Sequence, residues 1–93
     1  MSGDPPRYRH SPHVETSKVA ERLVLYHREL RKALVLNPTG SVLWELLTQS
    51  QIKQTLTAQL RSKFPSVKEE QAVSDVSAFL ADLLQHGMLV EEK

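Results

Sequence analysis

The sequence predicts an α+β fold, winged-helix-like, in which a three-stranded antiparallel sheet is followed by three helices. Short apolar runs of strand length occupy the chain before residue 37, and apolar residues at helical spacing occupy most of the chain after it. Strands and helices are thus segregated along the chain, which is typical of the α+β class. The length of 93 residues allows one domain, with or without a tail.

The first twelve residues are rich in proline, with Pro5, Pro6 and Pro12 around a basic and aromatic stretch. Proline fixes φ and removes a backbone donor, so we expect a flexible N-terminal tail at 1–12 and a single domain at 13–93. The tail contains no apolar segment, and a signal peptide is not expected. No apolar run reaches the roughly 18–20 residues that span a bilayer, so no membrane partner is expected.

Three strands are expected between residues 14 and 36. Residues 23–26 and 32–36 are short, continuous apolar runs separated by a polar stretch of hairpin-loop length. Residues 14–19 supply a weaker third strand. The competing interpretation is a helix over residues 17–36, because Glu, Arg, Leu and Ala are good helix formers. The shortness of both apolar runs favours strands.

Three helices are expected after the strands. Asn37 can cap a helix over residues 38–47, with Pro38 at its first position. Ser50 is the expected N-cap of a second helix over residues 51–63. Ser66 and Glu69 fit a capping box that opens a third helix over 67–86, and Gly87 stands at its C′ position. Residues 88–90 form a short apolar end that suits a strand.

The charge distribution is uneven although the net charge is only +1. Residues 1–68 carry eleven Lys or Arg against five Asp or Glu, a net of +6, whereas residues 69–93 carry a net of −5. In a winged helix the third helix would enter the DNA major groove, and here that helix carries four acids from Glu69 onward and no Lys or Arg after Lys68. A small DNA-binding winged-helix regulator, using the basic strands and tail, is therefore the less favoured alternative, and no nucleic-acid partner is expected.

The sequence offers little for catalysis. It contains no cysteine, which excludes a disulfide framework, a thiolate metal site and a cysteine nucleophile, and which suits the cytoplasm. There is no glycine-rich phosphate loop. His10 and His13 have a spacing that chelates a metal on a helix, but Pro12 lies between them. We expect no enzyme activity, no cofactor and no metal site.

An open sheet edge is the most informative expected feature. If residues 32–36 lie at an edge, their free backbone groups can pair with an added strand. Arg31 and Lys32 would then either guard the edge against aggregation or contact an acidic peptide. Ala72 and Phe79, on the flank of the third helix, could form the other wall of a peptide groove, and Asp75 is partly sheltered beside them. The pattern is equally compatible with plain core packing, and an open edge could also serve to dimerise the chain.

Several segments together resemble the PqqD-like family. They are Leu36-Asn37-Pro38-Thr39-Gly40, then Leu43-Trp44-Glu45-Leu46-Leu47, Phe64-Pro65, the stretch Asp75-Val76-Ser77-Ala78-Phe79-Leu80, and Gly87-Met88-Leu89. The resemblance covers about residues 14–90. The family comprises leader-peptide recognition elements for ribosomally synthesised, post-translationally modified peptides, including the pyrroloquinoline quinone chaperone and the recognition proteins of lasso-peptide clusters. The chain departs from the family pattern at Thr48-Gln49, where an Asp-Gly turn is usual, and at Ile52, where Thr is frequent.

The resemblance implies a non-catalytic adaptor or chaperone that binds the leader region of a precursor peptide as an added strand. It also implies a partner enzyme that modifies or processes the precursor, such as a leader protease or a radical enzyme. The chain itself could be a monomer or a homodimer. Taken together, the resemblance and the edge-strand argument predict a peptide site formed by Arg31, Lys32, Ala33, Leu34, Val35, Leu36, Ala72, Asp75, Val76 and Phe79.

Overall fold

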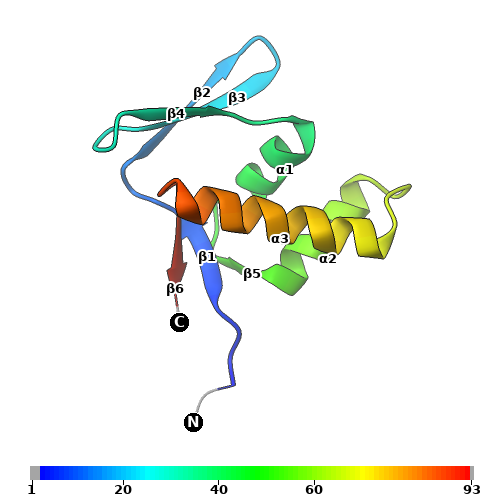
Figure 1. Ribbon diagram of the computed structural model, residues 1–93. Helices are drawn as coiled ribbons and strands as arrows, with labels where there is room; N and C mark the ends of the chain where they lie inside the picture. Colours follow the sequence, from blue (N-terminus) through cyan, green and yellow to red (C-terminus); the bar gives the residue numbers. More distant parts are fainter. Residues whose placement is uncertain (1–2, 93) are drawn as a thin grey trace.

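A computed structural model describes residues 3–92, and it contains three helices packed beside two small antiparallel sheets (Figure 1). The predicted α+β class is confirmed. The elements follow the chain in this order: β1 Arg7–His10, β2 Val14–Val19, β3 Arg22–His27, β4 Lys32–Val35, α1 Pro38–Leu46, β5 Gln51–Ile52, α2 Lys53–Lys63, α3 Glu69–Gln85 and β6 Leu89–Glu92.

The first sheet has the order β2-β3-β4 and is built from two successive hairpins. Its strands are the three that the sequence predicts. A two-residue turn joins β2 to β3, and its first residue, Ala20, adopts a positive φ of 58°. Arg31, at the end of the β3–β4 turn, also has a positive φ, of 55°. Both outer strands of this sheet, β2 and β4, leave one edge without a partner strand in the described part of the chain.

The second sheet has the order β5-β1-β6 and was not foreseen. The tail expected at residues 1–12 is corrected by it, because Arg7–His10 form β1 and pair with Leu89–Glu92. Tyr8 is buried to 8% exposure, and Arg9 forms an ion pair with Glu92 at 3.1 Å. These contacts join the two ends of the chain. A strand of four residues that pairs with another some eighty residues away has no local signature in sequence.

The helix ends agree with the sequence where the cap is local. The Asn37 side chain accepts a hydrogen bond from Gly40 N at 2.7 Å, and Pro38 begins α1 as predicted. Gly87 follows α3 with a φ of 74°, as expected of a C′ glycine. Two predicted caps are wrong: α2 begins at Lys53 after Ile52, and α3 begins at Glu69 after Lys68, in both cases without a side-chain cap.

One hydrophobic core joins the helices to both sheets. Its completely buried members include Leu25 from β3, Leu43 and Leu47 from the α1 region, Leu56 from α2 and Val76 from α3. Since α3 packs its buried stripe against this core, its flanking stripe remains available to form a surface beside β4. Among the described residues, no helix is both long and apolar enough to cross a membrane.

Candidate functional site

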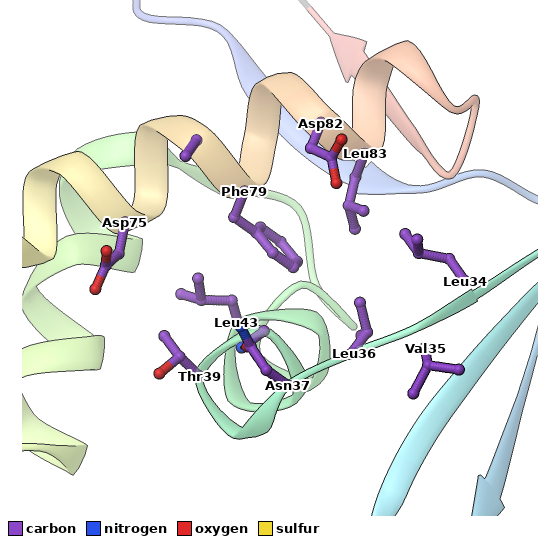
Figure 2. A pocket seen from close by; sticks show the side chains of 12 residues that line it. Leu34, Val35, Leu36, Asn37, Thr39, Leu43, Asp75, Phe79, Asp82 and Leu83 are labelled. Atoms are coloured by element: carbon purple, nitrogen blue, oxygen red, sulfur yellow. The ribbon is translucent and has the colours of Figure 1, made fainter.

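A cavity of about 570 Å³ lies between β4, the start of α1 and α3 (Figure 2). Most of its lining residues are apolar, with two carboxylates on the helix side. The lining residues are Leu34, Val35, Leu36, Asn37, Thr39, Gly40, Leu43, Asp75, Ala78, Phe79, Asp82 and Leu83. We call this cavity, together with the open edge of β4, the β4–α3 groove.

Helix α3 forms one wall of the groove. Asp75, Phe79 and Leu83 are spaced four residues apart, so they lie on one face of the helix, with Asp82 beside Leu83. Figure 2 shows Phe79 projecting from the middle of this face, with Asp75 at one end and Asp82 at the other. Phe79 is only half-buried, so part of its ring is free to contact another chain.

Strand β4 forms the opposite wall. Leu34 and Leu36 point toward α3, whereas Val35 points to the other face of the sheet and is 56% exposed (Figure 2). The Leu36 amide donates to the Leu23 carbonyl at 2.9 Å, which makes this pair a hydrogen-bonded one. Because hydrogen-bonded and non-hydrogen-bonded pairs alternate in an antiparallel ladder, the backbone N–H and C=O groups of Ala33 and Val35 point away from β3 toward the open edge.

The first turn of α1 forms the floor. The Asn37 cap fixes where the chain leaves β4 and enters the helix. Gly40 is buried there, and a Cβ atom on it would lie 3.1 Å from Asn37 Oδ1 and 3.5 Å from the Phe79 ring. A residue without a side chain therefore lets α1 approach Phe79 closely. Leu43, completely buried, closes the floor beneath.

The charged groups of the groove are arranged unevenly. Asp75 Oδ1 accepts a hydrogen bond from Gln71 Nε2 at 2.8 Å, and Asp82 Oδ1 lies 3.4 Å from His86 Nδ1. In the described part of the chain, neither carboxylate has a Lys or Arg nitrogen within the 4.0 Å of an ion pair. Arg31 and Lys32 lie at the hairpin end of β4, before the groove-lining part of the strand.

The ten predicted site residues are separated into three groups. Leu34, Val35, Leu36, Asp75 and Phe79 line the groove together. Arg31, Lys32 and Ala33 are exposed and continue β4 past the end of the lining. Ala72 and Val76 are completely buried in the core and have no surface to offer a ligand.

The sequence prediction missed seven lining residues. Asp82 and Leu83 could have been found, because they continue the helical spacing from Asp75 and Phe79 by another turn. Asn37, Thr39, Gly40 and Leu43 carry no such signal, since they were assigned to a helix cap and to core packing. Ala78 completes the set.

A second cavity, of about 430 Å³, lies beside the open edge of β2. Seven of its nine lining residues are polar or charged, among them Lys18, Glu21 and Glu45. The His10 ring stacks on Trp44 there, with centroids 3.6 Å apart, and its Nε2 lies 2.7 Å from the Trp44 carbonyl. Burial lowers the pKa of His10, and the hydrogen bond with the carbonyl partly opposes this effect.

The arrangement suits binding of an extended chain better than reaction chemistry. The β4 edge offers unpaired backbone donors and acceptors beside a cavity lined mainly by apolar residues, and this combination accepts a guest strand. No group of three or more His, Cys, Asp or Glu among residues 3–92 is placed to hold a metal ion. Helix α3 carries Glu69, Glu70, Asp75 and Asp82 without a Lys or Arg, so it presents repulsive charge to a DNA backbone.

Comparison with known proteins gives a family and a fold. The family model described as coenzyme PQQ synthesis protein D (PqqD) matches residues 22–89. A solved structure described as lasso peptide synthetase B1 complexed with the leader peptide is 20% identical and superposes with a TM-score of 0.78, over 89% of this chain and 96% of that one. A second, TbiB1 in complex with the TbiA(beta) leader peptide, is 22% identical with a TM-score of 0.78, over 87% of this chain and 93% of the other. Among curated proteins, no match is found.

Proposed function

We propose that this chain, which belongs to the PqqD family, is a non-catalytic adaptor that binds the leader region of a ribosomally made precursor peptide. In this proposal the leader adds as a strand to the open edge of β4 and packs its side chains into the β4–α3 groove. The adaptor then presents the precursor to a modifying or processing enzyme, such as a leader protease or a radical enzyme. A cytoplasmic location fits this role, because precursors are made there.

The observation that carries the proposal is the position of the open edge. The free backbone groups of Val35 border a cavity most of whose lining residues are apolar, and those of Ala33 continue the same open edge. Main-chain hydrogen bonds supply affinity in strand addition, and pockets for alternate side chains supply specificity. The β2 edge has the same backbone groups, but the cavity beside it is lined mainly by polar and charged residues, among them Lys18, Glu21 and Glu45, so β4 is the better candidate.

The comparisons support the same reading. Both solved neighbours are recorded with a leader peptide, and each shares the fold over most of its length. The groove side chains of α3 belong to the part of this chain that the family model matches. We infer that a single peptide-binding domain carries the function, and that β1 belongs to it, since Tyr8 is buried in the common core.

Binding of a labelled leader peptide to the purified chain tests the proposal. The peptide is synthesised from a precursor gene beside the gene of this chain, and anisotropy is followed as protein is added. We expect saturable binding that an unlabelled copy reverses and that a scrambled peptide of equal composition does not reproduce. Equal binding of the scrambled peptide, or no binding of any neighbouring leader, would contradict the proposal.

A further inference from the structure

We infer that the β4–α3 groove selects peptides in which a basic residue is followed or preceded, two positions away, by a large apolar residue. The basic side chain would face Asp75 and the apolar side chain would face Phe79. This inference rests on the proposed function, since it specifies which strands the groove accepts. It concerns the chemistry of the guest and applies to either direction of the guest strand.

The spacing of α3 matches the spacing of an extended guest. Asp75, Phe79 and Leu83 are each four residues apart on the helix, which corresponds to about 6 Å along its axis. In a strand, side chains on the same face are two residues apart, or about 6.6–6.8 Å. Figure 2 shows Phe79 and Leu83 on the side of α3 nearest Leu36 and Leu34, and Asp75 further along the helix, past the end of β4 toward Thr39. Consecutive groove-facing residues of a guest strand would therefore meet Asp75, Phe79 and Leu83 in turn.

The carboxylate of Asp75 favours a cationic guest side chain at its end of the groove. Asp75 is partly buried, and within residues 3–92 its one observed side-chain partner is the neutral amide of Gln71. The nearest bases in sequence to the β4 wall, Arg31 and Lys32, precede Leu34 at the hairpin end of β4, the end of the groove opposite Asp75. A carboxylate that a guest covers without supplying a positive partner is desolvated at a cost. A Lys or Arg of the guest placed here removes that cost and adds a charge-assisted hydrogen bond.

Asp82 favours a basic guest residue less strongly than Asp75 does. It is exposed, it already lies 3.4 Å from His86 Nδ1, and it stands at the Leu34 end of the groove (Figure 2). The third groove-facing position of the guest meets Leu83, which is buried, and Leu34, which is half-buried. The expected preference is therefore basic, then apolar, then apolar, at alternate positions, with the basic preference concentrated at Asp75.

A random peptide library tests this pattern without knowledge of the natural leader. Displayed ten-residue peptides are selected on the full chain, on Asp75→Asn and on Glu70→Gln. Asn keeps the Oδ1 acceptor for Gln71 but removes the charge, and Glu70→Gln makes the same change at an exposed position of α3 outside the groove. We expect the wild-type chain and Glu70→Gln to enrich Lys or Arg two positions from a large apolar residue, and Asp75→Asn to lose the basic preference.

The affinities of one selected peptide then measure the coupling between Asp75 and the basic residue of the guest. We expect its Kd to rise about three- to tenfold on Asp75→Asn, with the same rise when its basic residue is changed to Gln and little further rise when both changes are combined. Peptides selected without a basic preference, or a preference that survives Asp75→Asn, would overturn the inference and leave the peptide-binding groove standing. If no peptide is selected and the natural leader also fails to bind, both the inference and the proposed function are contradicted.

Discussion

Replacement of Val35 by proline separates strand addition from simple side-chain docking. The Val35 N–H points to the open edge and not to β3, because the bond from Leu36 N to Leu23 O fixes the alternation of the ladder. Proline is tolerated in an edge strand where its missing donor faced outward. The Val35 side chain is 56% exposed, so little core packing is lost. We therefore expect the free energy of unfolding to stay within about 1 kcal/mol of the wild-type value.

Peptide binding responds differently to the same change. A guest carbonyl that lost its Val35 donor would be covered without a partner, which costs about 1–2 kcal/mol and raises Kd roughly 5- to 30-fold. Calorimetric titration with the leader peptide measures this shift, and urea unfolding measures stability in parallel. Val35→Thr is the matched control, since it keeps the N–H and the β-branched shape, and it should bind as the wild type does.

Two results would refute the reasoning. If Val35→Pro folds and binds the leader with a Kd within twofold of the wild-type value, the guest strand does not accept a hydrogen bond from the Val35 N–H. An equal loss in Val35→Thr would assign the effect to the side chain instead. Leu34→Pro is the destabilising control. The Leu34 N–H points to β3, because Leu34 pairs with Leu25 at a hydrogen-bonded position, so this variant should unfold at a much lower urea concentration than the wild type.

Three further predictions address the groove, the backbone and the pH dependence. Phe79→Ala should raise the Kd of the leader peptide at least tenfold. Val73→Ala, at an exposed site on α3 outside the groove, should leave this Kd unchanged, and titration with the leader peptide measures both values. Ala20→Gly should raise the free energy of unfolding by about 0.5–1 kcal/mol because Ala20 has a positive φ, and a lower value in urea unfolding would contradict the strain argument. Burial lowers the pKa of His10 below the ordinary 6.5, so the unfolded state binds more protons and stability should decrease as pH falls below about 6.5. The variant His10→Phe keeps a ring against Trp44 without a charge, so its free energy of unfolding should fall less steeply between pH 8 and pH 5 than that of the wild type. Equal pH dependence of the two proteins would contradict the assignment to His10.

Much of the fold could be predicted because its signals are local. The two apolar runs of β3 and β4, the Asn37-Pro38 start of α1 and the Gly87 end of α3 all depend on neighbouring residues. The second sheet depends instead on pairing between Arg7–His10 and Leu89–Glu92. Nothing within either tetrapeptide specifies the other, so a proline-rich start was interpreted as a tail.

Tertiary contacts also explain a failed cap. Ser50 was expected to cap α2, but its hydroxyl accepts from Arg7 Nε at 3.0 Å and donates to Glu92 at 3.1 Å. The side chain is thereby used between β1, β6 and the α1–β5 connection. A serine before a helix is a capping residue only if no distant partner competes for its hydroxyl.

Five of the ten predicted site residues line the groove, and a helical rotation explains why Ala72 and Val76 do not. Asp75 and Phe79 lie on the flank of α3 that faces the groove, whereas Ala72 and Val76 lie on the stripe that faces the core. One residue along a helix is a rotation of about 100°, enough to exchange these two environments. Which stripe is covered depends on where the rest of the chain packs, and so does the floor formed by Gly40 and Leu43.

Amide hydrogen exchange with and without the leader peptide tests strand addition at β4 most directly. The N–H groups of Ala33 and Val35 face the open edge of β4, and those of Thr16 and Lys18 have the equivalent position on β2. Saturating leader peptide should slow exchange at Ala33 and Val35 and leave Thr16 and Lys18 unchanged. Protection at Thr16 and Lys18 instead, or binding that protects neither edge, would contradict the assignment of the leader to the β4–α3 groove.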